Sequence, residues 1–410
     1  MPLSIHLERR LASYSGGERI LGKVVFESQR PVELEDITVT FSGRAKAKVQ
    51  KVKGAVAPSA SYKSKCVLFE KRRILLHLSG STLVPGCHEW PFEFMFPSHV
   101  QCSARWPDTL PFRSDAEHPL PPTFAAETGD SLRRLDCAID YRIRAQVFKP
   151  QKNIFKKSPL FDEMVRLNFI PQTARLEADS PNSTYRDVKE QLFTVRSLLL
   201  LPENRGRSLK LQEKMQSWLS PSQLPRFDFQ IALSYSTRMV QSEPLDCILD
   251  IVPFMEYSSI SFPPEVILQS LAITVVGRTA ARAAPSLMGA ISGEIDERME
   301  VLCKHSLGMP VSGQVNLGQM FGPLAIKSSD VSFSTFNIAR LYRLCATFSF
   351  ECAGKILTFS QSDLPISIMA DGPARDSKDE KPMSGEMRHE DAPPSYTSVS
   401  ILSTTTFEKR

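Results

Sequence analysis

The sequence lacks the marks of several large protein classes. Its 410 residues contain no apolar run of about 18 residues, so no segment is predicted to be a transmembrane helix. The first ten residues alternate and carry charge where a secretory signal needs an apolar block. The eight cysteines, at positions 66, 87, 102, 137, 247, 303, 345 and 352, show no paired spacing. We therefore expect a cytoplasmic protein whose cysteines are reduced, buried thiols.

Enzyme signatures are also missing. The chain has no Gly-x-Ser-x-Gly elbow, no Gly-x-x-x-x-Gly-Lys-Ser/Thr loop, no Gly-x-Gly-x-x-Gly turn and no His-Glu-x-x-His motif. Four potential metal ligands, Cys87, His88, His99 and Cys102, lie close in sequence, but the adjacent Cys87 and His88 would point to opposite faces of a strand. We expect no enzyme activity, cofactor or metal. A β-sandwich enzyme or metal-binding protein built on these four residues is kept as an alternative.

The positive charge is concentrated in one hairpin-like segment. The chain carries +5, and residues 44–73 hold ten cations against one acid, Glu70, so this segment carries +9 and the remainder −4. The ten cations are Arg44, Lys46, Lys48, Lys51, Lys53, Lys63, Lys65, Lys71, Arg72 and Arg73. They are typical either of a solvated edge strand or of an acceptor for acidic protein tails or anionic lipid. Nucleic acid is not expected, because aromatics are few and no binding motif is present.

Strand patterns run through most of the chain. Residues 139–147 are apolar at every odd position and polar at every even one, which predicts a strand with one buried face. Residues 20–26 and 37–41 are short β-rich runs, and residues 343–350 alternate as cleanly as 139–147. Because no amphipathic helices separate these strands, we predict an all-β protein of two antiparallel immunoglobulin-like β-sandwich domains.

Breaks in composition predict the domain boundaries. We expect a first sandwich over 1–170, a hinge over 171–187, a second sandwich over 188–370 and a disordered polar tail over 371–410. One short helix is predicted where Leu211, Met215, Trp218 and Leu219 recur at helical spacing. We expect this apolar stripe to pack on a core, with a membrane-surface helix as the alternative.

The tail contains a peptide-ligand motif. Pro393 and Pro394 hold their segment close to polyproline II, and Tyr396 adds an apolar ring with a hydroxyl group. This Pro-Pro-x-Tyr pattern is the ligand that WW domains bind in an aromatic-lined groove. Two near matches, at 121–124 and 263–266, lack the tyrosine and are interpreted as turn or edge prolines.

A series of markers runs in order through residues 1–370. The markers are Gly17, Gly22 and the segments 37–43, 83–97, 120–124, 139–145, 333–342 and 352–355. In these markers the chain resembles the arrestin family and, within it, the fungal α-arrestins, which are arrestin-domain adaptors. In the segment 83–97, Trp90, Phe92 and Phe94 alternate, and we expect them to be core aromatics.

The resemblance implies the arrestin fold and a non-enzymatic adaptor. Such an adaptor links the cytosolic tails of membrane transporters or receptors to a WW-domain HECT-type ubiquitin ligase, for ubiquitin-dependent endocytosis or sorting, with ubiquitin as the modification. It implies peripheral recruitment to the plasma membrane or endosomes and a cargo contact through cations of the first domain. A trafficking or signalling scaffold whose WW partner is not a ligase remains an alternative. The buried polar core of visual and β-arrestins is not traceable, so their receptor-activation switch is not carried over.

Overall fold

The computed structural model describes residues 2–11, 13–51, 60–78, 81–102, 106–107, 109–150, 158–171, 185–204, 207–286, 289–328 and 330–371. Residues 1–373 form one compact unit, and residues 374–410 form a second. The second unit, and with it nearly all of the tail predicted to be disordered, lies outside the described residues.

The first lobe is defined by the strands β1 to β10. They are β1 (Leu3–Leu7), β2 (Arg19–Ser28), β3 (Val32–Glu33), β4 (Asp36–Lys51), β5 (Ala60–His77), β6 (Thr82–Leu83), β7 (Gly86–Met95), β8 (Phe124–Gly129), β9 (Arg133–Phe148) and β10 (Phe161–Leu167). One sheet has the order β1-β2-β7, and a second has the order β10-β9-β4-β5 with β8 paired to β9. Strands β3 and β6 form a small separate pair. All of these pairings are antiparallel.

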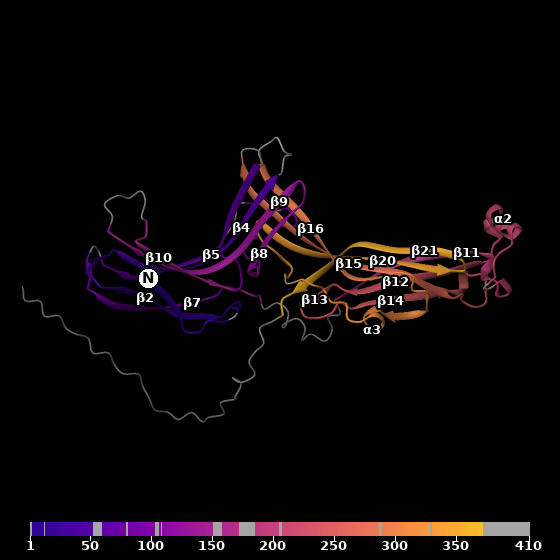
Figure 1. Cartoon of the computed structure of the whole chain (residues 1–410), viewed down its shortest axis with the longest axis horizontal. Coiled ribbons are helices and arrows are strands. Elements are labelled where there is room, and N and C mark those ends of the chain that lie inside the picture. The colour runs from indigo at the N-terminus through magenta and orange to yellow at the C-terminus, as the bar shows by residue number, and fades with distance from the viewer. Residues whose placement is uncertain are drawn as a thin grey trace, which may run out of the picture. The chain divides into compact units, whose positions relative to one another are not determined.

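The second lobe begins at β11 and carries the short helices. Its strands are β11 (Arg186–Arg196), β12 (Arg226–Ser236), β13 (Arg238–Val240), β14 (Cys247–Phe254), β15 (Val266–Ser286), β16 (Gly289–Lys304), β17 (Met309–Val311), β18 (Gly313–Asn316), β19 (Phe333–Ser334), β20 (Ile338–Cys352) and β21 (Lys355–Met369). The helices are α2 (Leu211–Leu219), α3 (Leu317–Phe321) and the 3-10 turns η1 (Leu198–Leu200), η2 (Pro202–Asn204), η3 (Pro221–Gln223) and η4 (Met255–Tyr257). The sheets have the orders β11-β12-β14-β18 and β13-β21-β20-β15-β16 (Figure 1). The predicted all-β fold is confirmed, and among the named strands of the described residues β13 and β21 pair in parallel rather than antiparallel.

Alternating side chains build the first core. On β9, Ile139, Tyr141 and Ile143 are fully buried, as their odd positions predict. Tyr141 belongs to an aromatic cluster in which the Phe41 ring lies 4.7 Å from that of Phe69 and 4.9 Å from that of Phe96. Edge-to-face ring pairs at this spacing add stability in addition to the free energy gained by burying their apolar surface. Phe92 and Phe94 are buried as expected, whereas Trp90 is only partly buried against the same core.

The two lobes share buried structure. The first hydrophobic core includes five residues from the second lobe, which are Ala281, Ala283, Ile295, Phe336 and Ile338. They come from β15, β16 and β20 and from the turn before β20. The buried residues of the second core all lie between 195 and 370, and Ile170, from the segment after β10, packs against them. The proposed hinge at 171–187 falls mostly outside the described residues, so the domain boundaries stay a prediction.

Two sequence expectations were wrong in part. Helix α2 forms where its spacing predicts, but Leu211, Met215 and Leu219 are 76%, 57% and 67% exposed, so these three side chains do not pack on a core. The helix lies in the connection between β11 and β12, beyond the ends of the strands, where no sheet face is available (Figure 1). All eight cysteines are free thiols, but only Cys66, Cys137, Cys247 and Cys352 are buried. Cys87 is exposed at the beginning of β7, which is an edge strand.

Substitution of Gly43 tests the packing of the first core. A Cβ atom at Gly43 would lie 2.6 Å from Cε1 of Tyr141 and 2.7 Å from Cε1 of Phe69. Because both rings are fully buried, we expect Gly43→Ala to lower the free energy of unfolding by about 1–3 kcal/mol, measured by urea denaturation. The control is the Phe69→Leu background, which removes one ring edge. In that background Gly43→Ala should lower the free energy of unfolding by less than it does in the wild type. Equal losses of stability in both backgrounds would contradict the packing of Gly43 against Phe69.

Burial also controls thiol reactivity. Desolvation raises the pKa of Cys137, Cys247 and Cys352 from 9.0 to about 12, so at pH 8 these groups are almost entirely protonated. We expect iodoacetamide at pH 8 to alkylate exposed Cys87 in the folded protein and to leave these three unmodified, as read by mass spectrometry. These thiols ionise near pH 9.0 in the unfolded chain but only near 12 in the folded protein. The free energy of unfolding should therefore fall as the pH rises from about 9 toward about 12. Native labelling of Cys137 at the rate of Cys87 would refute the burial.

Candidate functional site

The segment predicted to be cationic forms the β4–β5 hairpin in the first lobe. Strand β4 lies between β5 and β9, and its apolar side chains Ala45, Ala47 and Val49 point into the core. The intervening side chains of β4 therefore point to the opposite, outer face of the sheet. Lys46 on β4 is paired with Lys65 on β5, and Lys48 is paired with Lys63.

A β-bulge decides which cations share this outer face. The register shifts between Gly43 and Arg44, where β5 contains the extra residue Leu68. Because of the shift, odd positions of β5 face outward before the bulge and even positions face outward after it. Six of the predicted cations consequently lie on the outer face, which are Arg44, Lys46, Lys48, Lys63, Lys65 and Arg72. We call these six residues the cationic face.

The other four predicted cations are placed differently. The Nζ atom of Lys71 donates to the main-chain oxygen of Met95 at 3.1 Å, and the Arg73 guanidinium lies 5.4 Å from the centre of the Phe94 ring. Both side chains therefore leave the cationic face and turn toward β7. Lys51 is exposed at the end of β4, and Lys53 lies outside the described residues.

Neighbouring strands add charges that the segment count did not include. Strands β9 and β10 bring Arg142, Arg144 and Arg166 to the same outer face, but also Asp136, Asp140 and Asp162. Asp140 forms an ion pair with Lys46, with 2.8 Å between the carboxylate oxygen and Nζ. Asp162 accepts hydrogen bonds from the Arg144 guanidinium at both of its carboxylate oxygens. That hydrogen bond raises the pKa of Arg144 and keeps its guanidinium fully charged.

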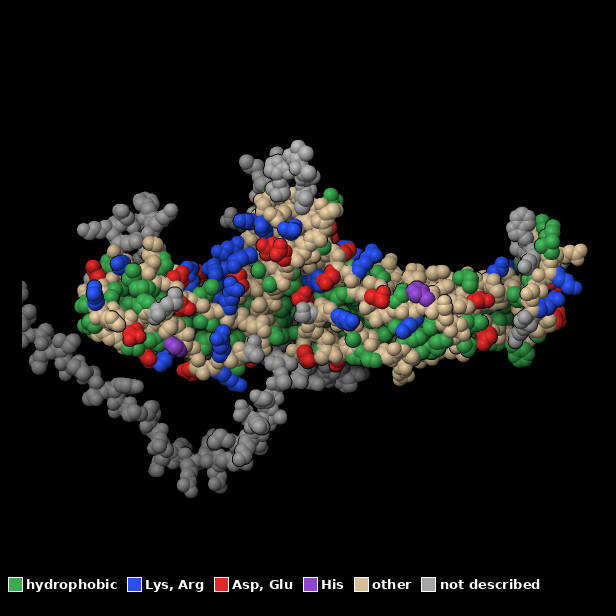
Figure 2. Space-filling view, viewed as in Figure 1, with side chains coloured by type: hydrophobic (Ala, Val, Ile, Leu, Met, Phe, Trp, Pro, Cys, Tyr) green, Lys and Arg blue, Asp and Glu red, His purple; other side chains and the backbone are tan. Residues whose placement is uncertain are grey.

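The cationic face keeps an excess of unpaired charge. Arg44 pairs with Glu70 at 3.2 Å. Within the described part of the chain, Lys48, Lys63, Lys65 and Arg72 have no acidic partner within 4.0 Å. Like charges placed opposite each other destabilise a sheet, and Lys48 lies opposite Lys63 on β5, but on its other side its partner on β9 is the acidic Asp136. Figure 2 shows lysine and arginine side chains gathered over the region of β5 in Figure 1.

The four potential metal ligands are not assembled. The ring of His88 stacks on Trp90 and bonds the main-chain oxygen of Val84 at 2.9 Å, while Cys87 is exposed beside it. His99 pairs with Pro119 in an isolated bridge. Across the described ranges, no group of three His, Cys, Asp or Glu side chains is placed to hold a metal ion.

A buried polar seam, absent from the sequence-based predictions, joins the two lobes. We use this name for Ser64, Arg282 and Asn337. The Nη1 atom of Arg282 donates to the main-chain oxygen of Pro107 at 2.7 Å, and its Nε donates to that of Phe336. Asn337 donates to the Ser64 hydroxyl at 2.8 Å, and this hydroxyl donates to the main-chain oxygen of Arg282. Arg278, four residues earlier on β15, is partly exposed and pairs with Asp296, so the spacing of the two arginines gives no sequence signal for the buried one.

His118 makes a second connection beside the seam. Its Nδ1 atom lies 2.7 Å from the main-chain oxygen of Asp115, and its Nε2 atom lies 2.9 Å from Oγ1 of Thr335. Burial lowers the pKa of His118, so the ring is neutral at physiological pH. A neutral ring that donates from Nδ1 accepts the Thr335 hydroxyl at Nε2. The segment before β8 is thereby tied to the turn before β20.

The predicted WW ligand, Pro393, Pro394 and Tyr396, lies outside the described residues. Its near match at 121–124 has a structural role, since the Tyr141 hydroxyl donates to the main-chain oxygen of Pro121 at 2.6 Å. None of the described helices has the length and apolar character needed to cross a bilayer.

Comparison with known proteins bears on the first lobe. Residues 3–162 match the family model described as "Arrestin (or S-antigen), N-terminal domain". A search of curated proteins finds no match. The matched segment contains β1 to β9 in full and therefore the whole cationic face. The first lobe, with its β4–β5 hairpin, is thus similar to the N-terminal domain of arrestins.

Proposed function

We propose that this protein is a non-enzymatic adaptor that joins membrane-protein cargo to a WW-domain HECT-type ubiquitin ligase. The similarity of the first lobe to an arrestin domain supports a trafficking adaptor or scaffold in general. The more specific role depends on two features, the cationic face and the Pro-Pro-x-Tyr segment of the tail. In this role the chain serves ubiquitin-dependent endocytosis or sorting, and it is recruited to membranes from the cytoplasm.

The cationic face provides the cargo contact in this proposal. The observation that carries it is that Lys48, Lys63, Lys65 and Arg72 share one sheet face without acidic partners among the described residues. An acidic or phosphorylated cytosolic tail presents carboxylate or phosphate oxygens that these cations bind as charge-assisted hydrogen bonds. The strand surface is extended, which suits an extended peptide. An anionic lipid surface would be an alternative ligand for the same charges.

The tail provides the ligase contact. Adjacent prolines restrict φ to values near polyproline II, so a Pro-Pro-x-Tyr ligand such as Pro393, Pro394 and Tyr396 is expected to lose little ordering entropy when a WW domain binds it. One such motif binds weakly, on the order of micromolar, so simultaneous engagement of cargo raises the ligase's effective concentration near cargo lysines. If the WW partner is not a ligase, the same geometry describes a trafficking or signalling scaffold. Mass spectrometry of proteins captured by the tail separates the two.

Removal of charge tests the cargo contact. We expect the triple variant Lys48→Gln/Lys63→Gln/Lys65→Gln to bind a poly-glutamate peptide roughly tenfold more weakly, since each exposed ion pair contributes about 0.2–1 kcal/mol. Titration calorimetry at low and high salt measures this, and the loss should shrink as salt rises. The control Arg19→Gln/Lys23→Gln/Lys189→Gln removes three exposed cations elsewhere. Equal affinity of wild type and the first variant, or loss confined to anionic vesicles, would refute a peptide contact here.

Substitution of Tyr396 tests the ligase contact. We expect Tyr396→Ala to abolish capture of the chain by immobilised WW domains, because the groove loses the aromatic ring that it grips. The fold should be unchanged, as judged by circular dichroism and thermal unfolding. Ser395→Ala is the matched control, since the third motif position is not read. Capture of Tyr396→Ala at the level of wild type would remove the link to the ligase.

A further inference from the structure

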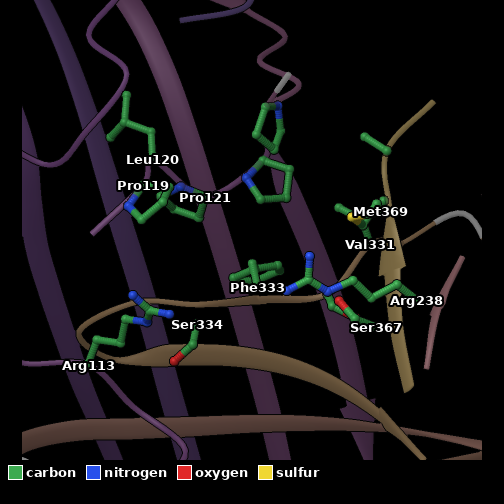
Figure 3. Close-up of a pocket in the computed structure, with 14 residues that line it drawn as sticks. Arg113, Pro119, Leu120, Pro121, Arg238, Val331, Phe333, Ser334, Ser367 and Met369 are labelled. Carbon is green, nitrogen blue, oxygen red and sulfur yellow. The ribbon is translucent and has the colours of Figure 1, made fainter. Parts of the chain in front are cut away.

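The first strand of the second lobe, β11, lies at the edge of its sheet. Among the described strands it pairs with β12 and has no partner on its other side. Its beginning is fixed at the junction of the lobes, where the main-chain oxygen of Tyr185 accepts a hydrogen bond from the N–H of Thr237 at 2.8 Å. The Arg238 guanidinium lies 4.0 Å from the centre of the Tyr185 ring, and Arg238 pairs with Ser367 of β21 (Figure 3). An edge strand presents a row of unpaired backbone groups, so a further strand can be added beside β11.

The even-numbered residues of β11 turn their backbone groups toward this open edge. In an antiparallel ladder, every second residue bonds the partner strand and the residues between them point away from it. The bond from Thr237 to Tyr185 continues the register of β11 and β12 by one residue, so the odd positions of β11 face β12. Consistent with this, the N–H of Val188 donates to Oδ1 of the neighbouring Asp187 at 2.8 Å and not to β12. The N–H and C=O groups at the even positions up to 194 therefore face the edge.

The side chains at these even positions lie on the outer face of the same sheet, away from the second core. The odd positions turn inward, since Phe193 packs against the second core and Val195 belongs to it. On the outer face, Val188 and Leu192 are 46% and 69% exposed, and Glu190 between them is also exposed. An added strand would thus meet an apolar, an acidic and an apolar side chain in succession.

The acidic position has no counter-charge in the described part of the chain. Glu190 pairs with Ala232 of β12, and Ala232 pairs with Asp250 of β14, so two carboxylates lie in one row across the outer face. Neither carboxylate has a basic partner within 4.0 Å among the described residues, and the neighbouring Lys189 is engaged by Asp187 at 2.8 Å. This row therefore favours a cation on the strand that pairs with β11.

A cavity of about 370 Å³ opens on the outer face next to Leu192. Leu192, Phe254 and Tyr257 line it, with Gln230 between the strands that carry them. Of the side chains on an added strand, the one opposite Leu192 lies nearest to this cavity. A large apolar side chain at that position would bury surface against all three lining residues.

A second copy of β11 does not fit this edge well. When two copies pair antiparallel with Val188 of one copy opposite Leu192 of the other, each Glu190 lies opposite the Glu190 of the other copy. Like charges placed directly opposite each other destabilise a sheet. A strand with a cation between two apolar residues meets the same edge without that repulsion.

We propose that β11 binds an extended peptide segment of another protein by antiparallel strand addition. The segment has a large apolar residue, then a lysine or arginine two positions later, and a second apolar residue two positions after that. These side chains lie opposite Leu192, Glu190 and Val188, in that order. Main-chain hydrogen bonds at the even positions of β11 supply affinity, and the pair with Glu190 selects the sequence. The contact goes beyond the proposed adaptor role and uses neither the cationic face nor the tail motif.

The first test compares two capped peptides that differ in one charge. The probe is acetyl-Thr-Leu-Thr-Lys-Thr-Val-Thr-amide, and its control has glutamate in place of the lysine. Hydrogen exchange of residues 186–196 in the full-length protein, measured by mass spectrometry over a peptide titration, reports both affinity and location. We expect saturable protection of this segment by the lysine peptide, and at least about fivefold weaker binding of the glutamate peptide.

N-methylated peptides test strand addition itself. The amide of the peptide lysine faces β11 and donates to the main-chain oxygen of Glu190, whereas the amide of the next threonine faces away. N-methylation of the lysine amide should therefore abolish the protection of residues 186–196. N-methylation of that threonine, the matched control, should leave the protection in place.

Variants of the protein test the charge and the apolar contact. Glu190→Lys should reverse the preference, so that the glutamate peptide protects the segment better, whereas Glu33→Lys, at an exposed acid of the first lobe, should change nothing. Leu192→Ser should weaken both peptides. Because Glu190 and Leu192 are exposed, circular dichroism should be unchanged in these variants.

The proposal is overturned if the two peptides protect residues 186–196 equally, if the lysine N-methyl peptide acts as the parent, or if Glu190→Lys keeps the original preference. Absence of any saturable protection also overturns it. Full protection of this segment without peptide would show that another copy or another part of the chain covers the edge, and would refute a foreign strand there.

Discussion

Each side chain of β4 points either into the core or to the outer face, and this alternation joins stability to charge in one strand. Phe41, Ala45 and Val49 are fully buried on the inner side. The residues between them carry Arg44, Lys46 and Lys48 outward. A one-residue slip of β4 would bring lysines into the core, so burial of the inner face fixes the register of the cationic face as well. The core therefore determines where the charges lie.

Alternation also explains how much the sequence predicts. It places β9 and β20 correctly, because their period of two is uninterrupted. Simple alternation does not predict β5, because the extra residue Leu68 shifts the pattern by one position. As a result, the side chains of Lys71 and Arg73 point toward β7. The segment count of ten cations against one acid could not include Asp140 or Asp162, since strand pairing brings them in from 67–118 residues away in sequence. For α2, periodicity identifies a helix with an apolar stripe, but it cannot tell whether a core lies opposite.

The polar seam shows a different limit of sequence reasoning. Arg282 is 2% exposed, and the acceptors of its guanidinium include main-chain oxygens at 107 and 336, which no residue type reveals. Buried polar groups are costly unless they are hydrogen-bonded, so Ser64, Arg282 and Asn337 stabilise the junction only in one relative placement of the strands that carry them. The apolar residues of β15 and β20 that pack in the first core also stabilise the junction in this one placement. Packing and hydrogen bonding together make residues 1–373 one unit.

Solvated charges on an open sheet favour one kind of partner over others. Lys48 and Lys65 are solvated, so each ion pair with a bound anion contributes little free energy. Salt screens the attraction beyond about 8 Å at physiological ionic strength. Such a surface is suited to weak, reversible contact with a long acidic tail, in which many small gains add. It would need a second attachment, such as a bound WW domain, to hold cargo for long. The contact would also be sensitive to salt, because exposed charges are screened far more than buried ones.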